Sequence, residues 1–212
     1  ESLNPLIREG AVNKHLPKDY QDKIALLRKY RMRVAGHLQI KPPFVTERET
    51  VEDVIASARE LYGKGLVDRI IIMTMNSRPS TLVGKLEQEG KYELPSHWSV
   101  VEIMRQLGKG LCHETRFYGF VVMDPKIKVV KGCEECDDVI MPLILDFSGS
   151  GDEYDRIMAA ADSLNCPCKR EWQQKMDPAN QPSTTLPERI AKGLDDLGRE
   201  YLGKSFQEMK EE

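Results

Sequence analysis

The sequence lacks the short motifs that mark several common enzyme classes. It has no Gly-x-Ser-x-Gly elbow, no phosphate-binding P-loop and no dinucleotide-binding glycine fingerprint. Its four histidines, His15, His37, His97 and His113, are scattered along the chain, and His97 is the first of them to test for a role in function. These absences favour a protein that is not an enzyme, and an enzyme stays as the alternative.

The sequence also lacks a membrane-spanning run and a signal pattern. No apolar stretch approaches the roughly 18 residues that cross a bilayer, and the N-terminus has no charged, apolar and small-residue series. We therefore expect a soluble intracellular protein of unknown compartment. The chain begins with Glu instead of Met, so removal of a leader stays open.

Charge is unevenly distributed along the 212 residues. The net charge of −3 argues against a protein that coats nucleic acid with its whole surface. Residues 1–48 nevertheless carry ten Lys/Arg against five Asp/Glu, whereas residues 134–155 carry eight acids and no base. Solvated faces explain such asymmetry, and so does a basic surface that binds a specific partner.

The basic front contains an expected amphipathic helix from Tyr20 to about Gly36. Arg and Lys at this spacing suit a phosphate backbone, because their binding releases condensed counterions. We predict contact with nucleic acid or an acidic protein through the helix, and through a loop that follows a strand over 69–75. The candidate residues are Arg28, Lys29, Arg31, Arg33 and Arg78.

The remaining periodicity predicts an α+β fold. Helices are expected over 51–62, 81–90 and 99–108, and strands over 116–123, 126–131 and 139–147, which would form an antiparallel meander. Pro142 cannot donate to a ladder, so the last strand would begin after it, bulge there or lie at an edge. We expect helices packed on a small, largely antiparallel sheet, with an N-terminal helical arm and a C-terminal helix.

The chain shows one candidate linker. Residues 177–185 are rich in Pro, Asn, Ser and Thr, and Pro187 stands at a plausible start of a last helix. We predict a main domain over 1–176, a loop over 177–185 and a C-terminal helix over 186–212. That helix packs on the same domain or on a partner.

Two cysteine pairs give the sharpest candidate site. Cys133-x-x-Cys136 and Cys166-x-Cys168 bracket a predicted strand, a glycine-serine loop and a helix, so the pairs are expected to finish near each other. Four thiolates suit a closed, structural zinc site. Free, partly buried thiols and disulfides are the alternatives.

Cys112-His113-Glu114, taken with Cys133-x-x-Cys136, resembles the ligand pattern of the zinc deaminases. In that family a glutamate transfers protons while the metal activates water, so the resemblance implies a catalytic zinc held by Cys112 and the later pair. Here Gly132 stands where the family pattern has proline. Ordinary residues at a helix end are the alternative.

Asp146-x-Ser148-x-Ser150 resembles the metal-ion-dependent adhesion site of von Willebrand factor A domains. That resemblance implies oxygen ligands for Mg²⁺ at the end of a strand. Together with Asp152, the segment is a candidate ligand loop for a Mg²⁺-assisted, phosphate-handling protein. A plain turn before a helix is the alternative.

No family resemblance covers the whole chain, and the leading hypothesis is a non-enzymatic binding or assembly protein. It would contact its partner through the basic helix and hold its acidic region with a zinc site. A zinc- or Mg²⁺-dependent enzyme and a homo-oligomeric structural protein are the alternatives.

Overall fold

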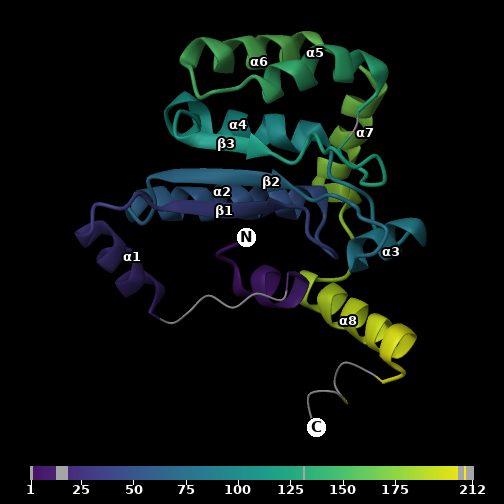
Figure 1. Ribbon diagram of the computed structural model, residues 1–212. Helices are drawn as coiled ribbons and strands as arrows, with labels where there is room; N and C mark the ends of the chain where they lie inside the picture. The colour runs from purple at the N-terminus through teal and green to yellow at the C-terminus, as the bar shows by residue number, and fades with distance from the viewer. Residues whose placement is uncertain (1, 13–18, 131, 205–207, 209–212) are drawn as a thin grey trace.

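The computed structural model describes residues 2–12, 19–130, 132–204 and 208 (Figure 1). Two predicted segments lie partly outside the described residues. They are the N-terminal arm, at residues 13–18, and the C-terminal segment, at residues 205–207 and 209–212. The elements in chain order are η1 (Leu6–Ala11, a π-helix), α1 (Tyr20–Lys29), β1 (Ala35–Ile40), α2 (Glu47–Gly63), β2 (Arg69–Thr74), α3 (Leu82–Gln88), α4 (His97–Cys112), β3 (Thr115–Tyr118), α5 (Glu134–Leu145), α6 (Gly151–Ser163), α7 (Pro167–Met176), η2 (Pro178–Asn180) and α8 (Leu186–Leu202).

The sheet is parallel, so the predicted antiparallel arrangement is wrong. Its order is β1-β2-β3, and both neighbouring pairs are parallel. Helices α2 and α4 lie between successive strands in the chain, and such crossovers return the next strand in the same direction. The combination of helices with a small sheet is confirmed.

The segment over 139–147 was predicted as a strand, but its residues 139–145 belong to helix α5 and Asp146 is the C-cap of that helix. Its buried residues Cys136, Ile140 and Ile144 recur every four positions, which is a helical spacing. Acids in the first turn also favour the positive helix start. Pro142 lies inside the helix despite the hydrogen bond it removes, so its predicted place in a strand is also wrong.

The other predicted strands and the first helix are also corrected. The strand expected over 116–123 is short, Thr115–Tyr118. The described part of 126–131 forms no strand and makes one isolated bridge, between Lys128 and Ser77, while residue 131 lies outside the description. Helix α1 ends at Lys29 instead of near Gly36, because Arg31 adopts a left-handed conformation with φ of 57° and the chain then enters β1.

Three helices begin with a reciprocal cap. Thr46 with Glu49, Ser150 with Glu153, and Thr185 with Glu188 each form a capping box, in which the side chains satisfy free backbone N–H groups. Helix α2 therefore begins three residues before Thr50, the cap that its apolar stripe suggests.

Helices α2 and α4 supply most of the core against one face of the sheet. Buried apolar side chains alternate along the strands, among them Leu38, Ile40, Ile70, Ile72 and Phe117, and they share a cluster with residues of both helices. Figure 1 shows α5 and α6 as an antiparallel pair on the side of α4, and α8 beside η1. Helix α1 has no buried residue and stands away from the body at the amino end of β1.

Candidate functional site

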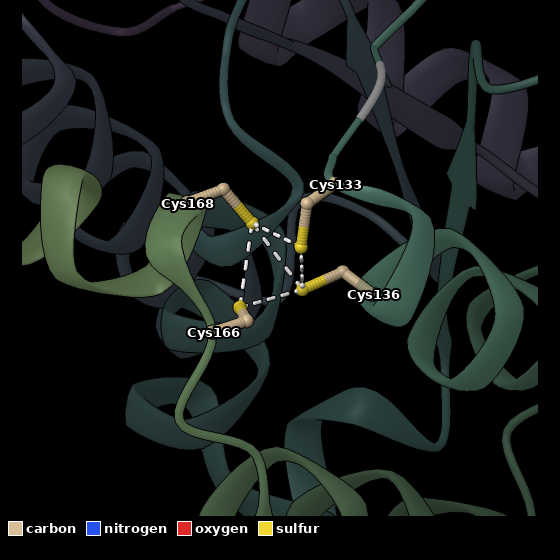
Figure 2. Close-up of side chains that lie close together, drawn as sticks. All are labelled: Cys133, Cys136, Cys166 and Cys168. Atoms are coloured by element: carbon tan, nitrogen blue, oxygen red, sulfur yellow. Dashed lines mark hydrogen bonds between the residues drawn. The ribbon is translucent and has the colours of Figure 1, made fainter.

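The four predicted metal-binding cysteines meet at one point (Figure 2). Their Sγ atoms all lie within 4.8 Å of one another, although the two pairs are 30 residues apart in the chain. Cys136 lies 2.8 Å from Cys166 and 3.2 Å from Cys168, while Cys133 lies 3.5 Å from Cys136 and 3.6 Å from Cys168. The predicted convergence of the pairs is confirmed.

Two helices of similar length bring the pairs together. The chain leaves through α5, which has 12 residues, and returns through α6, which has 13, so it travels about 18–20 Å each way. The predicted strand followed by a helix would have had two unequal lengths, so the two cysteine pairs would have ended farther apart. Cys133 is the N-cap of α5 and Cys166 is the N-cap of α7.

The cluster therefore lies at two helix N-termini, and this electrostatic setting favours thiolates. Unpaired backbone N–H groups and the positive ends of the helix dipoles stabilise negative sulfur. Pro167 occupies the first position of α7, where its missing N–H costs no helical hydrogen bond. Helix α7 therefore begins within the Cys-Pro-Cys segment, and both of its sulfurs belong to the four-cysteine cluster.

The donor set fits a tetrahedral metal ion. Zinc bound by four sulfurs at about 2.3 Å requires sulfur–sulfur separations of about 3.8 Å. Five of the six sulfur–sulfur separations are 2.8–3.6 Å and all six are within 4.8 Å, so small side-chain rotations would bring the cluster to that geometry. A site with four protein ligands has no position for a reacting water, which makes it structural instead of catalytic.

Burial and crowding set the thiol pKa values within the cluster. Burial raises the pKa of Cys136 and the neighbouring thiols raise it further, because a second negative charge is disfavoured there. Burial also raises the pKa of Cys133, but hydrogen bonds from Cys136 and other members of the cluster outweigh it and bring that pKa to about 7. A bound cation would reverse the repulsion and hold all four sulfurs as thiolates.

Residues around the cluster orient it. The indole Nε1 of Trp98 donates to Sγ of Cys168 at 3.3 Å. The ammonium group of Lys169 lies 5.1 Å from the centre of the Trp98 ring and donates to the carbonyls of Ala161 and Leu164 at the end of α6. This role of Trp98 has no signal in the sequence, because nothing there places α4 next to Cys168.

The structure separates Cys112 from the other cysteines. Its buried Sγ donates to the carbonyl of Met104 within α4, and burial raises its pKa to about 12. Among the described residues, the group of potential metal ligands contains the other four cysteines and neither Cys112 nor His113. The geometry implied by the resemblance to zinc deaminases is therefore not present.

The predicted ligand loop forms the turn between α5 and α6. Ser148 and Ser150 are hydrogen-bonded with Glu153, the partner in the capping box of α6. The side chains of Asp146 and Asp152 are exposed. The turn follows a helix and not the strand that the adhesion-site pattern implies, and within the described residues it forms no group of three metal-binding side chains. Its role in binding a ligand stays a prediction.

The four basic residues of the predicted helix lie together at the end of α1 and in the turn after it. Arg28 pairs with Asp68 at 3.4 Å, and Arg33 with Glu114 at 3.8 Å. Lys29 and Arg31 are exposed and have no ion pair in the described part of the chain. We refer to residues 20–33 as the basic arm.

Exposed apolar groups accompany these charges, and Arg78 lies elsewhere. Tyr30 of the basic arm is 70% exposed, and Leu26 and Met32 are exposed as well. Arg78 follows the carboxyl end of β2, whereas the arm leads into the amino end of β1. A parallel sheet of six-residue strands separates these edges by about 20 Å, so the structure does not bring Arg78 to the arm.

His97 occupies a closed site. It is 0% exposed, and neither ring nitrogen has a hydrogen-bond partner among the described residues. Burial lowers its pKa to about 4. Its ring also fills the space beside Gly132, where a Cβ atom would lie 2.2 Å from Cε1 of His97, so glycine is required before Cys133. Its functional role stays a prediction.

The fold and the four-cysteine cluster define an α/β protein with a candidate structural metal centre. No protein-family model matches the chain, and no solved structure matches it. No helix in the described residues is long and apolar enough to span a bilayer.

Two curated proteins from archaea are similar to the chain. Archaeosine synthase subunit beta of Methanosarcina acetivorans is 28% identical over 178 residues, which cover 84% of this chain and 49% of that protein. An uncharacterised protein of Methanocaldococcus jannaschii is 31% identical over 110 residues, which cover 51% of this chain and 30% of that protein. The chain thus spans at most about half of the relatives it matches.

Proposed function

We propose that the chain is the RNA-contacting part of a nucleoside-modifying protein. The similarity to archaeosine synthase subunit beta over 84% of the chain carries this proposal, because the name of that relative denotes the synthesis of a nucleoside. The basic arm supplies the contact, and the four-cysteine cluster holds α5 and α7 in place. The proposal concerns binding and assigns the chain no reaction step.

The charges of the basic arm support this assignment. Lys29 and Arg31 have no carboxylate partner in the described part of the chain, so phosphates would not compete with an existing ion pair there. Arg31 also holds a left-handed turn, a conformation that favours glycine. An exposed arginine at this strained position adds a charge at the cost of backbone energy.

The test is RNA binding by the whole chain. Fluorescence anisotropy with labelled tRNA should detect binding that weakens between about 50 and 200 mM salt. The double variant Lys29→Gln/Arg31→Gln should bind more weakly, and the slope of log affinity against log salt should fall by about one per lost phosphate contact. Arg156→Gln/Lys192→Gln removes the same charges from exposed positions on α6 and α8 and serves as the matched control.

Two results would contradict the proposal. The first is no RNA binding at low salt, and the second is equal loss of affinity in the arm variant and the control. Binding of an acidic protein in place of RNA would assign the arm to the other predicted class of partner.

We also propose that the four cysteines bind structural zinc. The short sulfur distances and the two helix N-termini support a metal held by thiolates. Elemental analysis of the purified chain should give one zinc per molecule. Cys136→Ser should lose the metal and Cys112→Ser should retain it, because only the first sulfur belongs to the cluster. Zinc retained by Cys136→Ser would overturn the assignment.

A further inference from the structure

One face of the sheet has no helical layer in the described part of the chain. Helices α2, α4 and α5 contact the strands, and the buried side of the sheet faces this core. The alternate side chains point to the opposite face. Parallel sheets are normally covered on both faces, so this second face is suited to an occupant. We call it the platform.

Strand register arranges the platform side chains in rows. One row is His37, Ile71 and Arg116, and the next is Gln39, Met73 and Tyr118. Ala35 and Arg69 form a shorter row at the amino edge.

The composition of the platform favours an anionic, aromatic ligand. Ile71 and Met73 are half-buried at its centre, and Tyr118 is 53% exposed at its carboxyl edge. The eight outward side chains include two arginines and no acid. A covering protein layer would require an apolar surface throughout, whereas half of these positions are polar or charged.

Two further observations concern the polar side chains of the platform. Nε of Arg69 is buried and has no hydrogen-bond partner among the described residues, which is uncommon for a buried donor. Gln39 uses its amide nitrogen to donate to the carbonyl of Met73 at 3.0 Å, which directs its amide oxygen to other donors. The basic arm also leads directly into β1, so phosphates bound there would lie next to the platform.

We propose that the platform binds a nucleobase of the RNA, which stacks on the ring of Tyr118. This inference rests on the proposed RNA contact and adds a base-binding site to it. Aromatic side chains on open sheets stack bases in this way, since every base offers a flat π-face. Gln39 lies in the same row as Tyr118 and supplies hydrogen bonds to the base, while Arg116 and Arg69 lie one and two rows nearer the amino edge and supply positive charge.

The test compares variants of Tyr118 in the same anisotropy assay. Tyr118→Ala should weaken tRNA binding about tenfold and leave the salt slope unchanged, because a stacked base releases no counterions. Tyr118→Phe should bind like the wild type, since the ring remains. Met123→Ala is the control, because Met123 is fully exposed shortly after the same strand.

The outcomes separate this inference from the proposed function. Wild-type affinity in Tyr118→Ala, together with weak binding in the arm variant, overturns the platform and leaves the arm intact. No RNA binding by any form of the chain overturns both. A change in the solution mass of Tyr118→Ala would assign the face to contact between protein chains and would overturn the base-binding site.

Discussion

A buried ion pair connects the sheet with the helices around the metal centre. Nζ of Lys41, directly after β1, lies 2.9 Å from Oε1 of Glu47 in the first turn of α2. Glu47 also accepts hydrogen bonds from the backbone of Ser96 and the hydroxyl of Ser99. Ser99 in turn accepts from Nε1 of Trp172 in α7, the helix that begins at the second cysteine pair.

Replacing Lys41 with Met should destabilise the protein by about 3–5 kcal/mol. At 2.9 Å the attraction is about 6 kcal/mol in an effective dielectric of about 20, and desolvation of both charges offsets much of it. The large effect comes from Glu47, whose side chain is 2% exposed and would be left buried without its cation. Met keeps the length of the lysine stem, so lost packing contributes little.

The assay is urea unfolding followed by tryptophan fluorescence, combined in a double-mutant cycle. Lys41→Met/Glu47→Gln should lose less than Lys41→Met alone, because the double variant has no unpaired charge. A loss below about 1 kcal/mol for Lys41→Met, or a double variant equal to the sum of the single ones, would refute the argument. Zinc content should also fall in Lys41→Met if this network fixes α7.

Three further predictions concern single positions. Trp98→Phe should lower zinc affinity about tenfold in competition with a chromophoric chelator, because Cys168 loses its N–H donor. Arg31→Gly should slow amide exchange in α1 relative to Arg31→Ala, since glycine avoids the left-handed cost of about 1–2 kcal/mol. Burial raises the pKa of Asp53 to about 6, above its ordinary value, so its contribution to stability is present below about pH 4 and is lost as pH rises through 6. Asp53→Asn should therefore raise the unfolding free energy at pH 7 by up to about 3 kcal/mol, and equal stability of the two forms across this range would contradict that.

Capping-box patterns in the sequence mark the starts of helices more accurately than apolar periodicity does. Thr46-x-x-Glu49 and Ser150-x-x-Glu153 are patterns of a capping box, and each marks a start that the apolar stripe places later. The loop around Ser148 is explained by the same pattern, because Glu153 is the partner of both serines. The serines that carry its resemblance to a cation site are the same two that hydrogen-bond with Glu153 at the start of α6.

Helix α5 shows where local preference gives the wrong element. The residues from Val139 to Phe147 favour a strand by composition, and Pro142 argues against a helix interior. Packing decides otherwise, because Cys136, Ile140 and Ile144 can be buried together only on a helical face. The strand direction in the sheet also depends on crossovers, which no single segment encodes. The two cysteine pairs can be recognised from their spacing alone, without knowledge of helix packing or of the crossovers. The cluster was therefore predictable, although the elements that support it were not.

The position of the four-cysteine cluster favours a role of the proposed zinc in folding and not in RNA contact. Figure 1 shows α1 and α7 at opposite ends of the strands, and the cluster lies where α7 begins. Loss of the proposed zinc would release α5 and α7, yet the basic arm is attached through Asp68 and Glu114 at the other edge. A chelator should therefore lower the melting temperature while the salt slope of RNA binding by the folded fraction stays constant. A lower slope in the chelated protein would place a phosphate contact at the metal centre itself.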